Sequence, residues 1–478
     1  MKTQLFIGNE WCDSASGETF PVENPATEEI IAEVSRADEA DVDRAVQAAR
    51  TCFDADEWRG MSPRKRGRLL YGLADLLESR LDEFATVETQ QNGKTLFESR
   101  IEIGMVARTL RYYAGWTDKI TGETLPVDGP FFTYTLREPV GVVGAIVPWN
   151  FPLNLAGWKF SPALAAGCTV VLKPSSETPL TALMMADLVL EAGFPAGAFN
   201  VVPGPGSTAG SALVRHPGVD KITFTGSTEV GRRLMAEAAG TNKRITLELG
   251  GKSPNIVFAD AAIDAAVKGA QTGIFYSKGE VCAAGSRLLV EKGVHAEVVE
   301  KLAEQAKRLT IGDPLDKNTR MGAVVSRDQQ KKILRYIEKG KSEGAKLVAG
   351  GSPATHNGKG YFVEATVFDR VTPEMTISRE EIFGPVLAVL EFDGLEHAIH
   401  LANETIYGLA AGIWTRDIAT AHRVAREIRA GTVWINGYNA YDPAAPFGGF
   451  KASGFGRDLG REALDGFLDT KTVWVGLK

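Results

Sequence analysis

The sequence predicts an α/β protein with more than one domain. The chain has 478 residues, which is more than a single compact core usually accommodates. Short β-branched segments alternate with helix-like stretches, a pattern typical of βαβ units around a parallel sheet. The alternation runs in two series that are separated near residues 247–254. We therefore expect two α/β domains of similar size.

The N-terminal quarter precedes both series and is predicted to be largely helical. Apolar side chains recur at helical spacing from Leu69 to Phe84, and Asn92-Gly93 is a typical helix stop. Such a stripe is usually the buried face of a helix.

The first series supplies four expected strands and three expected helices. Each strand is a short run rich in Val, Ile, Phe or Thr, and a helical stretch follows most of them. The expected strands are 140–148, 169–174, 199–204 and 221–226, and the expected helices are 154–167, 179–192 and 228–239.

The second series and two flanking segments complete the prediction. Segment 121–139 alternates and contains Gly and Pro, so it predicts an arm or hairpin. The C-terminal residues 467–477 predict a final strand that pairs with a neighbouring chain. The second series has expected strands at 254–260, 287–293, 388–392 and 431–436 and a helix near 295–308.

Composition excludes several classes of protein. Hydrophobic residues make up 44% and charged residues 24%, as in an ordinary globular protein, and the net charge of −7 disfavours nucleic acid or an anionic membrane as the main partner. The four cysteines are far apart with no CxxC, so neither a disulfide framework nor a metal site is expected. The start of the chain has no apolar signal segment, and the longest apolar run, 140–147, is too short to span a bilayer. We expect a cytoplasmic soluble protein.

One cysteine stands in an unusual setting, the stretch YSKGEVCAAGSR at 276–287. Small residues around Cys282 leave the sulfur reachable and let backbone amides approach it, which suits a nucleophile. The same stretch also suits a packed turn around a buried thiol, and the stretch alone leaves both readings open.

Two βα junctions are candidate phosphate sites. FTGSTEVG at 224–231 ends a strand and opens a helix. Gly226 permits a tight turn, and Ser227 and Thr228 would present hydroxyls and amides to a pyrophosphate, although a merely capped helix is an equal alternative. LKPSSETP at 172–179 places Lys173 at a strand end, where open α/β sheets bind ligands. TLELGGKS is not a P-loop, because Thr246 occupies the position of the required first glycine.

Two further side chains are candidates for catalysis. PWNFP at 148–152 holds Asn150 at the tip of a stiff loop, where prolines already fix the turn and leave its amide free. Glu248 lies at an apolar strand end, so its carboxylate is either hydrogen-bonded or a general base with a raised pKa.

Seven motifs, taken in order, resemble the aldehyde dehydrogenase superfamily, and the resemblance runs from about residue 5 to the C-terminus. RYYAGWTDK at 111–119 adds to it. The seven motifs are PWNFP (148–152), KPSSETP (173–179), FTGSTEVG (224–231), LELGGKSP (247–254), GEVCAAGSR (279–287), EIFGPV (381–386) and PFGGFKASGFGRD (446–458).

The resemblance implies an NAD(P)-dependent, hydrolytic enzyme. Cys282 would attack the aldehyde, and the oxyanion would be held by the Asn150 amide and the Cys282 backbone N–H. Glu248 would activate the water that hydrolyses the thioester, which favours release of a free acid over transfer to coenzyme A. Lys159 and Asp458 match positions that relay the proton from Glu248.

The resemblance also implies a coenzyme site. Ser176 stands where NAD-selective relatives often carry glutamate, which removes repulsion of a 2′-phosphate. We therefore expect NADP⁺ to be accepted at least comparably to NAD⁺. The implied cofactor residues are Val147, Trp149, Lys173, Ser176, Gly206, Gly226, Ser227, Glu381 and Phe383.

The implied substrate pocket is aromatic, and its positions are Met105, Phe151, Trp158, Tyr276, Tyr441 and Phe447. Such walls favour a medium-chain or aromatic aldehyde, with betaine-type or amino-aldehydes as the alternative through cation–π contact. Relatives that oxidise succinic semialdehyde tend to carry arginine where Trp158 stands, so an anionic semialdehyde is disfavoured.

The segment before the thiol departs from the superfamily pattern. Tyr276-Ser277-Lys278 replaces a more usual Phe-Asn pattern, and Glu280 stands where glutamine is frequent. We expect Glu280 to face solvent; pointing inward, it would oppose thiolate formation.

The resemblance implies an aldehyde dehydrogenase-like fold: a Rossmann-like coenzyme domain (1–120 and 140–250), an α/β catalytic domain (251–455) and a small β oligomerisation arm (121–139 and 456–478) of a homodimer or homotetramer. Two rival classes remain. A cysteine hydrolase would need a histidine base, and none of the six histidines lies in such a motif. A relative that kept the fold but lost the chemistry is disfavoured by intact Asn150, Glu248 and Cys282.

Overall fold

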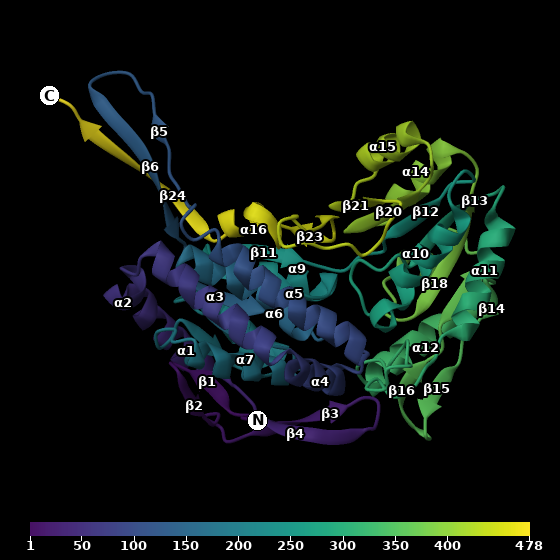
Figure 1. Cartoon of the computed structure of the whole chain (residues 1–478), viewed down its shortest axis with the longest axis horizontal. Coiled ribbons are helices and arrows are strands. Elements are labelled where there is room, and N and C mark those ends of the chain that lie inside the picture. The colour runs from purple at the N-terminus through teal and green to yellow at the C-terminus, as the bar shows by residue number, and fades with distance from the viewer.

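The computed structural model describes residues 1–478 and contains two large sheets, one in each lobe of the molecule (Figure 1). The predicted α/β fold class is confirmed. The first sheet has the order β2-β1-β9-β8-β7-β10-β11-β23, and its five central strands are parallel. Their bounds are Val142–Ile146 (β7), Thr169–Lys173 (β8), Phe199–Val201 (β9), Lys221–Thr225 (β10) and Arg244–Glu248 (β11); the edges are Leu5–Ile7 (β1), Glu10–Cys12 (β2) and Gly454–Phe455 (β23).

The strand order of this sheet reverses between β7 and β10. Counted from β7, the five parallel strands run 3-2-1-4-5, the arrangement of a Rossmann-like sheet. In such a sheet the ligand crevice lies beyond the carboxyl ends of the strands at the reversal. The loops after β7, β8 and β10 are therefore the expected place for a coenzyme.

Helices cover both faces of the first sheet. The predicted stripe from Leu69 to Phe84 belongs to two helices that are divided at Arg80, and Gly93 closes the second one in a left-handed conformation (φ 85°). The helices of this lobe are Glu39–Asp54 (α1), Asp56–Arg59 (α2), Pro63–Ser79 (α3), Leu81–Asn92 (α4), Leu96–Ala114 (α5), Pro152–Ala166 (α6), Leu180–Glu191 (α7), Ser211–Arg215 (α8) and Thr228–Ala238 (α9).

The second sheet has the order β14-β17-β18-β13-β12-β20-β21, with β14 as its antiparallel edge. Its strands are Pro254–Val257 (β12), Arg287–Glu291 (β13), Lys346–Ala349 (β14), Thr366–Asp369 (β17), Val386–Phe392 (β18), Ala410–Trp414 (β20) and Thr432–Ile435 (β21). Its main helices are Ile263–Phe275 (α10), His295–Arg308 (α11), Arg327–Ser342 (α12), Leu395–Asn403 (α14) and Ile418–Glu427 (α15).

A three-stranded arm projects from the first lobe and carries the C-terminus at its tip (Figure 1). It consists of Thr124–Leu125 (β5), Phe131–Pro139 (β6) and Leu468–Gly476 (β24), and β24 pairs with β6 along nine residues. Apolar side chains on the arm are exposed, among them Phe132 (47%) and Trp474 (56%).

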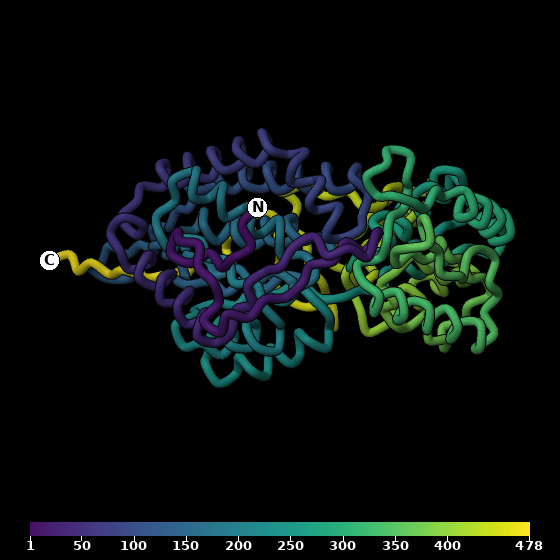
Figure 2. Tube along the Cα trace, turned by 90° about the horizontal axis from the view of Figure 1, so that it is seen from below, coloured from purple at the N-terminus to yellow at the C-terminus, as the bar shows by residue number.

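A long N-terminal hairpin, Thr19–Asn24 (β3) and Glu29–Ser35 (β4), runs along the molecule from the first lobe to the second (Figure 2). At its tip the Pro25 carbonyl accepts a hydrogen bond from the Tyr361 N–H at 2.9 Å. Tyr361 belongs to Lys359–Val363 (β16), which pairs with Pro353–His356 (β15).

One apolar cluster extends through both lobes, since it includes Phe160 of α6 and Leu288 of β13. The two lobes therefore share one apolar core. No helix in the structure is both long and apolar enough to cross a bilayer.

Candidate active site

Cys282 lies where two cavities of different character meet. It is half-buried, and it is the only residue that lines both an apolar cavity of about 400 Å³ and a polar cavity of about 200 Å³. The polar cavity shares Trp149, Thr225 and Gly226 with a third cavity of about 420 Å³ at the carboxyl ends of the first sheet. A thiol at such a junction can meet one molecule from each side.

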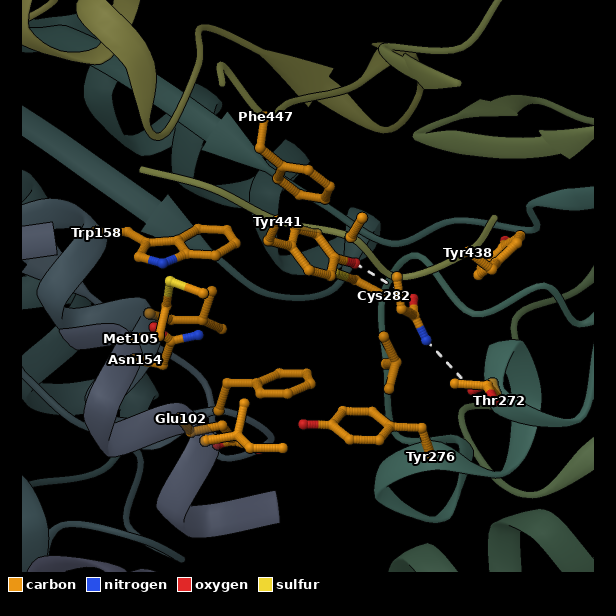
Figure 3. Close-up of a pocket in the computed structure, with 16 residues that line it drawn as sticks. Glu102, Met105, Asn154, Trp158, Thr272, Tyr276, Cys282, Tyr438, Tyr441 and Phe447 are labelled. Carbon is orange, nitrogen blue, oxygen red and sulfur yellow. Dashed lines mark hydrogen bonds between the residues drawn. The ribbon is translucent and has the colours of Figure 1, made fainter. Parts of the chain in front are cut away.

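The apolar cavity contains all six predicted pocket residues (Figure 3). Met105 comes from α5, Trp158 from α6, and Tyr441 and Phe447 from the segment after β21. Sequence reasoning missed Ile101, Glu102, Asn154, Leu155, Thr272, Val281, Tyr438, Asn439 and Ala440. Helical spacing was a usable signal, because Ile101 and Asn154 each lie four residues before a predicted pocket residue on the same helix.

Three aromatic rings form one wall of this cavity. The Trp158 ring centroid lies 5.5 Å from that of Phe447 and 6.2 Å from that of Tyr441, and Tyr441 and Phe447 are 5.6 Å apart. These tilted and edge-on contacts are the favoured geometries of aromatic pairs.

A carboxylate also reaches this cavity. Glu102 is buried and its Oε2 lies 2.5 Å from the Lys94 Nζ, whereas its Oε1 has no hydrogen-bond partner. Burial raises the pKa of Glu102 to about 8, against the opposing effect of Lys94. In Figure 3 the Tyr276 ring points toward Glu102. The cavity is therefore apolar with one acidic edge.

Asn150 lies next to the thiol and is 2% exposed. Its side-chain Nδ2 donates to the Glu280 backbone carbonyl at 3.0 Å, and its backbone carbonyl accepts from the Lys94 Nζ at 2.7 Å. An amide nitrogen carries two hydrogens, so one remains available toward the polar cavity that Asn150 and Cys282 both line.

Glu248 ends β11 and is almost completely buried. Neither of its carboxylate oxygens has a hydrogen-bond partner. Burial raises the pKa of Glu248 well above its ordinary value, and Asp458 adds to the rise. Space for the carboxylate exists because residue 448 is glycine, whose added Cβ would lie 2.6 Å from Oε1.

Lys159 and Asp458 form a buried ion pair close to this carboxylate. The Lys159 Nζ lies 3.0 Å from Oδ2 of Asp458, and both residues act on the pKa of Glu248. Lys159 comes from α6, and Asp458 comes from the C-terminal segment that returns to the first sheet through β23. The structure thus brings Glu248, Lys159 and Asp458 together.

The third cavity collects seven of the predicted coenzyme residues: Val147, Trp149, Lys173, Ser176, Gly206, Gly226 and Ser227. Lys173 is buried, and its Nζ donates to the carbonyls of Pro174 at 2.6 Å and Gly204 at 3.0 Å, which leaves one donor. Burial lowers the pKa of Lys173 to about 8.

The floor of this cleft fits a dinucleotide. An added Cβ on Gly226 would lie 2.4 Å from the Phe224 ring, so only glycine leaves the backbone open there. Ser227 caps α9, and the buried Thr225 hydroxyl beside it has no partner. The backbone N–H groups at the N-terminus of α9 and the unpaired Thr225 hydroxyl at the end of β10 are suitable donors for a pyrophosphate.

Glu381 and Phe383 complete the predicted set and line the polar cavity with Cys282. Glu381 accepts a hydrogen bond from the Gly251 N–H at 3.1 Å, and burial raises its pKa to about 7. The Phe383 ring stands edge-on to Trp149 at 5.3 Å. A group held by Glu381 would therefore lie within the cavity that leads to the thiol.

The prediction for Glu280 is wrong. Glu280 is fully buried and its Oε2 lies 3.0 Å from the Nζ of Lys278, which is 1% exposed. The sequence shows a charged residue among small ones, and only the tertiary structure reveals that Lys278 is buried with it.

The thiol of Cys282 is protonated in this environment. Burial raises its pKa to about 12, and the nearby carboxylates of Glu381 and Glu248 add to the rise. Backbone N–H groups of Ala283 and Cys282 lower it in part. No cluster of His, Cys, Asp or Glu in the structure is arranged to hold a metal ion.

Comparison with known proteins gives consistent matches over the whole chain. A sequence model described as the aldehyde dehydrogenase family matches residues 11–473. Retinal dehydrogenase 2 of Homo sapiens is 51% identical over 477 residues, which cover 99% of this chain and 92% of that protein.

Two solved structures show the same fold. The NAD⁺ complex of aldehyde dehydrogenase from Bacillus cereus has a TM-score of 0.98 at 49% identity and covers 100% of this chain and 97% of that one. Betaine aldehyde dehydrogenase from Staphylococcus aureus in complex with NAD⁺ has a TM-score of 0.98 at 39% identity and covers 100% of this chain and 95% of that one.

Proposed function

The chain belongs to the aldehyde dehydrogenase family, and on that premise we propose that it oxidises an aldehyde to the carboxylic acid through a thioester on Cys282. The observation that carries the proposal is the position of Cys282 between an apolar cavity and a polar cavity that continues into the dinucleotide cleft. An aldehyde from one side and a coenzyme from the other would meet at its sulfur.

The first step is attack of the Cys282 sulfur on the aldehyde carbon. Because the thiol is protonated at rest, it would release its proton to solvent through the open cavity, and the resulting thiolate is the form that attacks. The carbonyl oxygen becomes an oxyanion. The free N–H of the Asn150 amide and the Cys282 backbone N–H would hold it, and each donor of this kind contributes about 3 kcal/mol to the stability of the transition state.

The second step converts the adduct to a thioester. A bound nicotinamide coenzyme supplies the hydride acceptor for this step. Glu381 would hold the ribose next to the ring, and the Trp149–Phe383 pair would close the cavity against water. Glu248 would then take a proton from the water that attacks the thioester, and its unpaired oxygens and raised pKa suit that task. Lys159 and Asp458 would pass the proton onward.

We propose that both NAD⁺ and NADP⁺ are accepted. Ser176 lines the dinucleotide cleft, and Arg36 lines an adjoining cavity together with Ser176 and Glu177. A 2′-phosphate would meet the Ser176 hydroxyl and the Arg36 guanidinium. Glu177 opposes this, but it is exposed and accepts a hydrogen bond from Ser175.

The substrate class we propose first is a medium-chain or aromatic aldehyde. The wall of Trp158, Tyr441 and Phe447 supports it, since aromatic surfaces bind apolar groups. The similarity to a retinal dehydrogenase, an enzyme named for a large apolar aldehyde, supports the same class.

A second candidate is an amino- or betaine-type aldehyde. The observation that favours it is the unpartnered Oε1 of Glu102 at the edge of an aromatic cavity, since a carboxylate and aromatic faces both attract a cation. The similarity to betaine aldehyde dehydrogenase supports it as well.

Coenzyme reduction tests the proposal directly. The purified protein is mixed with NAD⁺ or NADP⁺ and with hexanal, benzaldehyde, betaine aldehyde or succinic semialdehyde, and Cys282→Ala is assayed alongside. We expect reduction with the parent and none with Cys282→Ala, and faster turnover of hexanal and benzaldehyde than of succinic semialdehyde. A strong preference for betaine aldehyde that Glu102→Gln abolishes would favour the second candidate.

Ser176→Glu should lower kcat/KM for NADP⁺ at least tenfold and leave kcat/KM for NAD⁺ within about threefold, because a carboxylate repels the 2′-phosphate.

We also propose the domain division 1–120 and 140–250, 251–455, and 121–139 with 456–478. The separate sheets support the first two units, and the exposed apolar side chains of the arm support an oligomerisation element.

A further inference from the structure

A fully buried ion pair lies in the segment that leads to Cys282. The Lys278 Nζ is 3.0 Å from Oε2 of Glu280, and both side chains are at most 1% exposed. Lys278 also donates to Oδ1 of Asn92 at 2.6 Å, and Oε1 of Glu280 accepts from the Val325 N–H at 3.1 Å. Two charges withdrawn from water are costly, so a pair in this position calls for a specific role.

The ion pair is part of a closed circuit of contacts. Asn92, which receives the Lys278 hydrogen bond, donates from its Nδ2 to the Trp149 carbonyl at 2.8 Å. The next residue, Asn150, donates from its Nδ2 to the Glu280 carbonyl at 3.0 Å. The circuit thus runs from Lys278 through Asn92 and the Trp149–Asn150 peptide to Glu280, and the ion pair closes it.

The backbone of this segment requires an external restraint. Ser277 (φ 47°), Lys278 (φ 59°) and Gly279 (φ 74°) are all left-handed, and two of the three carry side chains. L-residues disfavour this conformation, so the local sequence does not maintain it unaided. The Ser277 N–H donates to Oε1 of Glu98 at 2.7 Å, and the ion pair anchors the residues that follow.

We propose that the Lys278–Glu280 ion pair is a positioning device that aims the Asn150 amide and the Cys282 backbone N–H at one reacting oxygen. Cys282 follows Glu280 by two residues, and the Asn150 amide is hydrogen-bonded to the Glu280 carbonyl. A displacement of the Glu280 backbone would therefore move both donors. A shift of about 1 Å in such a site can cost about 10²-fold in rate. The inference rests on the proposed function.

The two charges of the ion pair predict how the activity of each variant depends on pH. Lys278→Met leaves the Glu280 carboxylate buried without its cation, and burial raises the pKa of that group. Its activity relative to the parent should therefore recover as the pH falls and Glu280 becomes neutral. Glu280→Gln leaves a buried ammonium whose pKa burial lowers, so its relative activity should recover as the pH rises. Lys94 and Glu98 are the other charged groups that act on this pair, and both stay in every variant.

The experiment compares the parent with Lys278→Met, Glu280→Gln and the double variant Lys278→Gln/Glu280→Gln, whose amides can pair without charge. Rates are expressed per mole of natively folded protein, measured by circular dichroism, so loss of folded protein does not count. We expect each single variant to lower kcat at least tenfold at pH 7.5 with KM within threefold, and the double variant to return within threefold of the parent. Lys341→Met, at an exposed pair 2.7 Å from Glu338, is the control and should match the parent.

Single variants with kcat within threefold of the parent would exclude a positioning role, and so would a double variant as slow as the product of the single effects. If the parent oxidises no aldehyde, the proposed function fails, and alkylation of Cys282 by iodoacetamide still decides the inference. That rate should fall at least fivefold in Lys278→Met, recover in the double variant, and show no such pattern if the pair is only structural.

Discussion

Cys282 combines a half-buried, protonated thiol with an open approach from two sides. Its pKa of about 12 lies far above neutrality because of burial and two neighbouring carboxylates. At neutral pH the unreactive thiol form therefore predominates over the thiolate.

This resting state predicts the pH dependence of alkylation. Without substrate or coenzyme, the rate of reaction of iodoacetamide with Cys282 should rise about tenfold per pH unit from about pH 7 to 9, since only the thiolate reacts. The measurement is peptide mass spectrometry, which separates Cys282 from the half-buried Cys12. A rate that reaches a plateau below pH 8 would contradict a pKa raised by burial.

Glu248 predicts a separation of the two chemical steps. In Glu248→Gln the attack by Cys282 and the hydride transfer remain, while activation of water is lost. Rapid mixing should show a burst of about one reduced coenzyme per subunit, followed by a steady state at least 10²-fold slower than the parent. A full loss of the burst would assign Glu248 to the first step instead.

At the scale of single residues, the sequence predicts identities better than environments. Spaced motifs indicate Asn150, Glu248 and Cys282, and the structure places them around one site. Glu280 shows the limit, because its burial depends on Lys278, Asn92 and Val325, and local spacing does not reveal such contacts.

At the scale of elements, the short strand β23 holds the C-terminal segment against β11. Gly454 pairs with Glu248, and the segment then carries Asp458 to Lys159. The strand is only two residues long, so its position depends on close backbone contact.

Gly454 therefore predicts a large effect from a small substitution. Its φ is +111°, and an added Cβ would lie 1.9 Å from the Leu247 carbonyl. Gly454→Ala should lower the thermal midpoint by several degrees, corresponding to about 3 kcal/mol, and should lower kcat because Glu248 moves with β11. Gly72→Ala is the control, since an added Cβ in α3 meets nothing within 4 Å. Equal midpoints for the two variants would show that β23 can shift without cost.

Strong β-branched runs predict elements well, and short or irregular ones do not. The expected strands at 169–174 and 221–226 correspond to β8 and β10 within one residue, and the expected helix at 295–308 is α11. β23 has no sequence signal, because its two residues pair only through distant contacts. The sequence pattern does not reveal the division of the leucine stripe at Arg80, because both helices keep the same apolar spacing.

At the scale of the whole molecule, the arm is the feature that a single chain does not explain. β6 and β24 carry exposed Phe132 and Trp474 away from both lobes. Replacing both with serine should convert the dimer or tetramer we expect into a monomer in sedimentation velocity. Ile418→Ser, at an exposed isoleucine of α15, is the control and should leave the assembly intact. A monomeric parent would contradict the proposed role of the arm.

The order of the predicted strands along the chain predicts the two sheets, since the strands of each series pair within one sheet. The distance between the sheets depends on the apolar cluster shared by both lobes, which includes residues as far apart as Phe6 and Trp434. Such contacts are set by the packing of the folded chain, and the sequence pattern does not contain them.

The junction of two cavities at Cys282 has a consequence for enzyme kinetics. Because the reactants arrive through separate mouths, occupation of one leaves the other open, and a ternary complex can form. Double-reciprocal plots at several coenzyme concentrations should intersect rather than run parallel. An unreactive alkyl analogue of the aldehyde should compete with the aldehyde alone, and an adenine nucleotide fragment should compete with the coenzyme alone.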